Sequence, residues 1–127
     1  MNIPSELKYT KEHEWIRVEG NIGVIGITEY AQGELGDVVF VDITKSVGDT
    51  LSVDENFGTI EAVKTVSELY APCSGKIVEI NSSLGDSPEN INQDPYNGGW
   101  MIKVEIANPA ELDVLLDSAA YSELIGV

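Results

Sequence analysis

The reactive side chains of interest are lysine, histidine and cysteine, and one lysine is the strongest candidate for a chemical role. Lys64 lies between two β-rich stretches, 57–63 and 65–72. If these stretches pair, the lysine lies at or beside a tight hairpin turn, where a modifying enzyme can reach its amine. Acylation would remove the positive charge of the amine, and the two arms would hold the attached group at a fixed place. Taken alone, however, an exposed lysine is usually a solvated surface charge.

The single histidine, His13, and the single cysteine, Cys73, offer weaker chemistry. His13 is flanked by Glu12 and Glu14, but a metal site usually has more nitrogen or sulfur ligands. In an alternating strand His13 would also point away from both acids, which favours a structural or surface role. Cys73 cannot form an internal disulfide, and we expect it to be a small buried apolar residue. The two residues together do not indicate a self-contained hydrolase.

Composition excludes several classes of partner. The 127 residues include 7 basic and 22 acidic side chains, which gives a net charge of −15. Such an acidic surface repels nucleic-acid phosphates and anionic lipid headgroups, so nucleic-acid and membrane roles are disfavoured. No apolar run approaches the ~20 residues of a membrane span. Residues 1–9 lack the features of a secretory signal and the only cysteine fits a reducing compartment, so we expect a cytoplasmic protein of one domain, 1–127.

An internal repeat is the most informative feature of the chain. The stretch 40–50 recurs as 77–87, at a constant offset of 37 residues and without a gap. Apolar residues match apolar ones and acids match acids, and Gly-Asp in one copy matches Gly-Asp in the other. Gly48 and Gly85 are therefore expected to occupy equivalent turns. Two copies are too few for a solenoid.

The repeat predicts a fold of two similar β-halves, about 37–63 and 65–106, packed face to face about a pseudo-two-fold axis. This symmetry, rather than any hairpin dipeptide, places Lys64 at the turn between the halves. The other expected elements are a hairpin (15–19 and 22–27), a helix capped by Thr28 (28–35), a buried strand (38–43), a loop (88–99), a strand (100–106) and a C-terminal helix (about 108–124).

Several motifs resemble the H proteins of the glycine cleavage system. Glu61-Ala62-Val63-Lys64-Thr65 resembles the lipoylation motif of that family. Further blocks resemble its N-terminal signature (7–15), its next two blocks (25–32 and 35–41) and its C-terminal signature (94–96 with 99–103). The matching blocks span roughly residues 7–116 in the order of the family. Several motifs in register are far more specific than one short pattern.

The resemblance implies a mainly β fold, namely a flattened β-sandwich of the biotinyl/lipoyl type (a barrel-sandwich hybrid) with a C-terminal helix. It also implies lipoate joined to Lys64 through an amide. The dithiolane of lipoate is then the working cofactor, and the protein supplies attachment and orientation. A protein of this kind is a carrier, not an enzyme, and performs no catalytic step alone.

The resemblance further implies a set of partners. In this family the oxidised lipoyl group accepts the aminomethyl group left when a pyridoxal-phosphate glycine decarboxylase decarboxylates glycine. An aminomethyltransferase then passes the one-carbon unit to tetrahydrofolate and releases ammonia, and a flavin dihydrolipoamide dehydrogenase reoxidises the dithiol. A lipoate ligase or a lipoyl/octanoyl transferase attaches the cofactor. A carrier that docks with several enzymes in turn is expected to be a monomer.

Four positions match functional positions of the family. Glu14 matches one that contacts the stored amine, and Glu68 lies where a second acid is common. Carboxylates in a cleft would hold the amine by charge-assisted hydrogen bonds and keep water away. Gly48, Glu61 and Glu68 match positions that the lipoylating enzyme recognises. A turn glycine at Gly48 and a solvated strand residue at Glu61 are equally compatible with the sequence.

Some residues depart from the family, and other functions stay open. Ala62 stands where Ser is frequent, and Thr65-Val66 replaces smaller residues, but the acceptor is kept. A biotin carrier normally has Met on both sides of its lysine, and a lipoyl domain of a 2-oxoacid dehydrogenase has Asp directly before it. Here Val63 and Thr65 flank Lys64. The alternatives that remain are a lipoyl-relay donor for other enzymes and an unmodified protein-binding adaptor.

Overall fold

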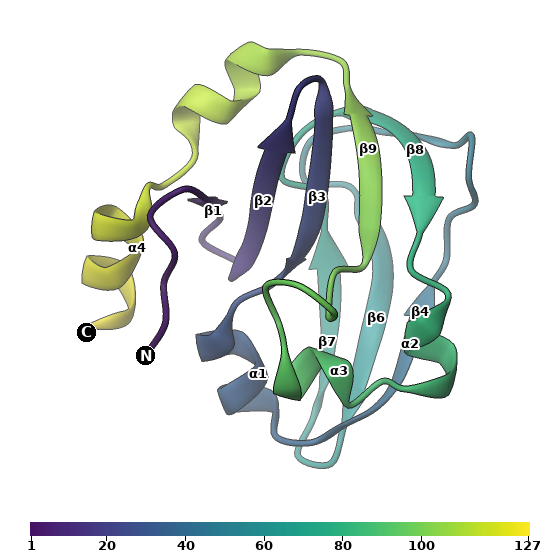
Figure 1. Cartoon of the computed structure of the whole chain (residues 1–127), viewed down its shortest axis with the longest axis vertical. Coiled ribbons are helices and arrows are strands. Elements are labelled where there is room, and N and C mark those ends of the chain that lie inside the picture. The colour runs from purple at the N-terminus through teal and green to yellow at the C-terminus, as the bar shows by residue number, and fades with distance from the viewer.

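Two antiparallel β-sheets form the framework of the computed structural model, which describes all residues 1–127 (Figure 1). In spatial order the larger sheet contains β1 (Lys8–Tyr9), β2 (Glu14–Glu19), β3 (Ile22–Ile27), β9 (Ile102–Ile106), β8 (Gly75–Ile80) and β5 (Thr50–Leu51). The smaller sheet contains β4 (Val38–Ile43), β6 (Asn56–Ala62) and β7 (Val66–Tyr70). Figure 1 shows the smaller sheet lying behind the larger one.

A hydrophobic core of 17 buried residues joins the two sheets. Ile25, Ile77 and Ile102 come from the larger sheet, and Phe57 and Ile60 come from the smaller one. Because side chains alternate across a strand, every second residue can enter this layer while its neighbours face solvent. Burial of each such side chain contributes about 1.5–3 kcal/mol. The predicted flattened β-sandwich is therefore confirmed.

Three short helices lie at the end of the sandwich where β6 turns into β7 (Figure 1). The helix α1 (Glu29–Leu35) begins as predicted, because the side chain of Thr28 accepts a hydrogen bond from the backbone N–H of Ala31. The helices α2 (Ser83–Asp86) and α3 (Asn90–Gln93) were not expected. They lie in the second copy of the repeat and in the segment predicted as a loop. None of the helices in the structure has both the length and the apolar character needed to span a bilayer.

The two copies of the repeat have the same structure in their strands but not beyond them. The strands β4 and β8 have the same bounds at an offset of 37 residues and lie in different sheets. Beyond the strands the copies diverge. Gly48 adopts φ +97° in a turn, whereas Gly85 lies in α2 without a positive φ. The prediction that the two glycines occupy equivalent turns is therefore wrong.

The strand β4 was expected to be buried, and this prediction is also wrong. β4 lies at the edge of its sheet and pairs only with β6. Val39 and Phe40 are 55% and 50% exposed, and a bulge interrupts the pairing between Val38 and Phe40. A run of β-branched and aromatic residues indicates a strand but does not say whether both of its faces are covered.

The C-terminal segment forms two helices instead of the one expected over 108–124. Asn108 caps a 3-10 helix, η1 (Pro109–Val114), as its sequence suggested. The chain then extends, and Leu116 exchanges two backbone hydrogen bonds with Tyr9, of 2.8 and 2.9 Å. Asp117 caps a new helix, α4 (Ser118–Ile125). This long-range pairing breaks the helix, although the apolar spacing of the segment is compatible with a continuous one.

Two glycines near the end of α1 allow a matched test of backbone conformation. Gly33 lies inside the helix, where a Cβ would meet nothing within 4 Å. Gly36 ends the helix with φ 81° and ψ −160°, a region that is open essentially to glycine alone. We expect Gly33→Ala to stabilise the protein by about 0.5–1 kcal/mol and Gly36→Ala to destabilise it by about 1–3 kcal/mol. Urea unfolding measures both, and equal effects would contradict this reading of Gly36.

Candidate functional site

Lys64 lies in the three-residue connection between β6 and β7, as the sequence predicted. The backbone N–H of Ala62 donates to the carbonyl of Thr65 at 2.9 Å and closes the turn. The N–H of Val63 donates to the carbonyl of Asp37, also at 2.9 Å, and ties the turn to the chain just before β4. The Lys64 side chain is exposed at this tip.

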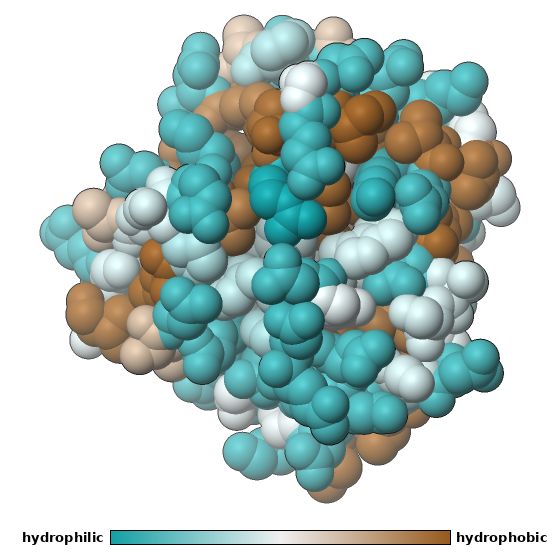
Figure 2. All heavy atoms as spheres, in the orientation of Figure 1, coloured by the Kyte–Doolittle hydropathy of each residue, from teal (hydrophilic) through white to brown (hydrophobic).

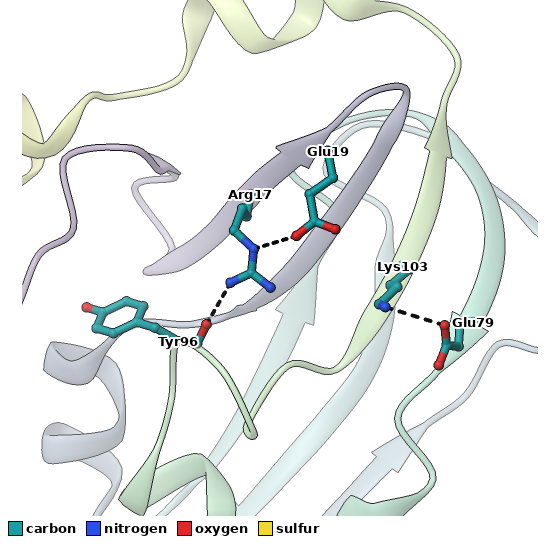
Figure 3. Close-up of polar contacts among 5 residues, drawn as sticks. All are labelled: Arg17, Glu19, Glu79, Tyr96 and Lys103. Atoms are coloured by element: carbon teal, nitrogen blue, oxygen red, sulfur yellow. Dashed lines mark hydrogen bonds and ion pairs between the residues drawn. The ribbon is translucent and has the colours of Figure 1, made fainter.

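The stem of Lys64 lies against Gly36. A Cβ on Gly36 would stand 3.3 Å from both Cγ and Cδ of the lysine, so the missing side chain leaves room for the stem. The amine of Lys64 forms no ion pair, whereas Arg17 and Lys103 each pair with a glutamate. Figure 3 shows Arg17 paired with Glu19 at 2.8 Å and Lys103 paired with Glu79 at 3.5 Å. Lys64 is thus supported along its stem and free at its nucleophilic end.

A cleft of about 230 Å³ opens beside the hairpin. Its walls come from the segment before β2, from α1 and from the two strands of the lysine hairpin. The lining residues include Glu12, His13, Glu14, Ile27, Tyr30, Ala31, Glu34, Leu35, Ile60, Thr65, Ser67, Glu68 and Leu69. The structure therefore brings Glu14 and Glu68, which are 54 residues apart, into one cleft next to the hairpin that carries Lys64.

Glu14 is a buried carboxyl without a cationic partner. Its side chain is only 1% exposed, and it accepts hydrogen bonds from Thr10 Oγ1 at 2.7 Å and from the backbone N–H of Tyr70 at 3.3 Å. Burial raises the pKa of Glu14 to about 8, and the two hydrogen bonds oppose this rise only in part. At neutral pH the residue is thus largely protonated, and a cation brought beside it would favour ionisation.

Of the other predicted site residues, Glu61 and Glu68 lie on the smaller sheet and Gly48 lies outside it. Glu68 is exposed, and its Oε2 accepts from Asn56 Nδ2 at 2.6 Å and from Thr59 Oγ1 at 3.3 Å. Glu61 is exposed on β6 and does not line the cleft. Gly48 lies beyond the far end of β4, because β4 starts beside Ala62 and runs away from the hairpin. The structure therefore separates Gly48 from the lysine.

His13 takes a position that alternation did not predict. It precedes β2 with φ 70°, so it is not a strand residue, and it lines the same cleft as Glu12 and Glu14 instead of pointing away from them. Its Nδ1 lies 2.9 Å from the hydroxyl of Tyr121, which lies 2.7 Å from Thr28 Oγ1. Burial lowers the pKa of His13. The histidine links the cleft to α4.

The helix α1 provides a wall of the cleft that was not predicted from the sequence. Tyr30, Ala31, Glu34 and Leu35 form two pairs spaced by four residues, and all four line the cleft. Residues four apart share one face of a helix, so this spacing was the available signal.

A flattened β-sandwich that displays an unpaired lysine on a hairpin, beside a cleft lined by four glutamates, has the architecture expected of a carrier domain. Residues 7–126 match the glycine cleavage H-protein family. The chain belongs to this family, and it is thus a carrier component of the glycine cleavage system.

Relatives of known sequence and structure agree with this assignment. The chain is 64% identical to the glycine cleavage system H protein of Symbiobacterium thermophilum, over 94% of this chain and 93% of the relative. It is 59% identical to the H protein of Staphylococcus haemolyticus, over 99% of both chains. The crystal structure of a glycine cleavage system H protein from Mycobacterium marinum superposes with a TM-score of 0.90 at 40% identity, covering 98% of this chain and 100% of the other.

The raised pKa of Glu14 predicts a specific dependence of stability on pH. Between the ordinary value of 4.5 and about 8, the folded protein keeps a proton on Glu14 that the unfolded chain has lost. The free energy of unfolding should therefore fall as pH rises, by up to about 1.4 kcal/mol per pH unit relative to Glu14→Gln. Below and above this window the difference should be constant. Urea unfolding from pH 4 to 9 measures it, with the exposed Glu105→Gln as control, and parallel curves for wild type and Glu14→Gln would rule the shift out.

Proposed function

We propose that Lys64 carries lipoate in amide linkage and that the loaded protein shuttles the aminomethyl group of the glycine cleavage reaction. The observation that carries this proposal is the placement of an exposed, unpaired lysine on a short hairpin beside the cleft that buries Glu14. The hairpin makes the amine accessible to a modifying enzyme. The cleft offers a nearby place in which the attached group and its cargo can be protected.

The residues of the cleft suit lipoate and an amine cargo. Ile27, Leu35, Ile60 and Leu69 provide an apolar lining for a hydrocarbon chain, and Glu14 and Glu68 provide acceptors for an ammonium group. When attached, lipoate supplies the disulfide and dithiol chemistry by which the group is carried. The protein itself binds, orients and shields, and we propose that it catalyses no step alone.

Glu14 and Glu68 would both bind the amine of the cargo, but with different strength. The carboxyl of Glu14 is desolvated, so it gains most from a cation, which would lower its pKa and release its proton. Glu68 lies at the exposed rim, and its Oε2 is fixed by Asn56 and Thr59. We expect Glu14 to hold the cargo strongly and Glu68 to hold it weakly.

The proposed partners are glycine decarboxylase, aminomethyltransferase, dihydrolipoamide dehydrogenase and the lipoate ligase or lipoyl/octanoyl transferase. We propose that a monomer docks with each in turn, and a net charge of −15 favours fast encounter with basic surfaces. Glu61 and Glu68 lie on the two strands of the hairpin, β6 and β7, near its turn. This position suits recognition by the lipoylating enzyme. If Gly48 is recognised as well, that enzyme must contact the full length of β4, roughly 20 Å.

Mass spectrometry tests the attachment directly. Protein produced with lipoate and a competent lipoate ligase should gain the mass of one lipoyl amide, on the peptide that contains Lys64. Lys64→Arg should gain none, while Lys76→Arg, which alters another exposed lysine, should be modified like the wild type.

Two outcomes would change the assignment. No lipoylation of the wild type, under conditions in which a control substrate is modified, would favour the unmodified adaptor. Lipoylation without glycine–bicarbonate exchange in the presence of glycine decarboxylase would favour the lipoyl relay.

The lifetime of the methylamine-loaded protein tests the cleft. Glu14→Gln removes the buried charge that holds the ammonium group, and a charged hydrogen bond is worth about 1.5–3 kcal/mol, so methylamine loss should accelerate about tenfold or more. Glu68→Gln should have a smaller effect because the side chain is exposed. Glu105→Gln, an exposed carboxyl outside the cleft, serves as control. Equal half-lives for wild type and Glu14→Gln would argue against storage in the cleft.

A further inference from the structure

The segment 88–99, which has no counterpart in the first copy of the repeat, is firmly built into the structure. Ile91 is fully buried in the main core. Trp15 Nε1 donates to the carbonyl of Pro95 at 3.0 Å, and Arg17 Nη1 donates to the carbonyl of Tyr96 at 2.9 Å (Figure 3). A segment held by the core and by two side chains of β2 can serve as a fixed support for its neighbours.

Asn92 is the residue through which this support acts. Its Oδ1 accepts a hydrogen bond from the backbone N–H of Val38 at 2.8 Å. Its Nδ2 donates to the carbonyl of Gly36 at 2.9 Å and to Gln32 Oε1 at 3.0 Å. One side-chain amide thereby joins α3 to the end of α1 and to the start of β4.

The contacts of Asn92 fix the direction of the peptide groups around Asp37. The carbonyl of Asp37 and the N–H of Val38 belong to one planar trans peptide group, so they point in opposite directions. The Oδ1 of Asn92 holds the N–H side of this group, and its Nδ2 holds the carbonyl of Gly36 just before it. The carbonyl of Asp37 is left for the opposite side, where it accepts the hydrogen bond from Val63.

The same clamp fixes the surface on which the lysine stem lies. Gly36 is held by Asn92 through its carbonyl, and its open Cα faces Cγ and Cδ of Lys64. Asn92 thus controls two supports of the hairpin tip without touching it: the backbone bond to Val63 and the bed of the Lys64 stem.

We propose that Asn92 is a positioning residue for the modification of Lys64, through the clamp on Gly36 and Val38 that orients Asp37 toward the hairpin. This proposal rests on the proposed function, because it deepens the role of Lys64 as the acceptor of lipoate. An enzyme that acylates the amine gains from an acceptor already held in place, since loss of orientation lowers the rate of the chemical step.

Asn92→Asp tests the clamp with minimal change of shape. A carboxylate at this position still accepts a hydrogen bond from the N–H of Val38, but it cannot donate one to Gly36 or to Gln32. It also places a negative charge against the carbonyl oxygen of Gly36 and against Gln32 Oε1. Asn97→Asp is the matched control, because it makes the same change of charge in the same segment at an exposed side chain with a single long contact of 3.5 Å. Amide hydrogen exchange at Val63 and the kinetics of lipoylation by a lipoate ligase with lipoate and ATP are measured for both variants.

For Asn92→Asp we expect exchange at Val63 to quicken on the order of tenfold or more and kcat of lipoylation to fall on the order of tenfold, with KM within about twofold of wild type. Asn97→Asp should match the wild type. A merely structural effect would reduce the folded fraction and raise the apparent KM instead. The proposal is overturned if Val63 exchanges as slowly in Asn92→Asp as in Asn97→Asp, or if kcat is unchanged despite faster exchange.

Two further results keep the test decisive. If the wild type is not lipoylated at all, the proposed function fails, whereas faster exchange at Val63 in Asn92→Asp still supports the positioning of the hairpin. If Asn92→Asp does not fold, the wild type alone provides the answer. Its Asn92 side-chain amide protons should exchange markedly more slowly than those of Asn97, and equal rates would overturn the clamp.

Discussion

The hydrogen bond from the N–H of Val63 to the carbonyl of Asp37 allows the hairpin tip to be both exposed and held in place. These two requirements otherwise conflict. An acceptor lysine must be exposed so that an enzyme can reach its amine, and exposed hairpin tips are mobile because few contacts hold them. Here a three-residue turn keeps the tip short, and the bond to Asp37 fastens it to the start of β4. The lysine therefore projects into solvent from a backbone that is held on both sides.

In the cleft beside the hairpin, the burial of the Glu14 carboxyl opposes its ionisation. Ionised carboxylates are costly to bury without a cation, and a buried acid usually keeps its proton instead. Glu14 is in this situation, because Thr10 and Tyr70 satisfy it only with neutral donors. The buried carboxyl of Glu14 therefore lacks only a cation to favour its ionised form. A cation brought beside Glu14 would supply the missing charge and lower its pKa, and without that cation the carboxyl keeps its proton.

The sequence predicted the fold and the hairpin well because both rest on local patterns or on a resemblance that spans the chain. The cap at Thr28 and the strand bounds of the repeat are encoded by nearby residues, and the turn at Lys64 follows from the symmetry of the two halves. The failures share another cause. The C-terminal helix is broken by pairing with Tyr9, more than a hundred residues earlier, and His13 leaves strand geometry where it meets Tyr121. No local period carries such contacts.

The site also shows how a repeated scaffold acquires a single functional end. Two similar strands, β4 and β8, build opposite sheets and by themselves would give equivalent ends. The asymmetry comes from what the repeat does not contain: α1 walls the cleft, and the segment 88–99 brings Asn92 against Gly36 and Val38. One asparagine among several in this stretch gives no sequence signal for this role, because two of its three partners are backbone groups. The lysine can be found by motif, whereas its support can be found only from the structure, since hydrogen bonds to main-chain atoms impose no pattern on the residues that supply them.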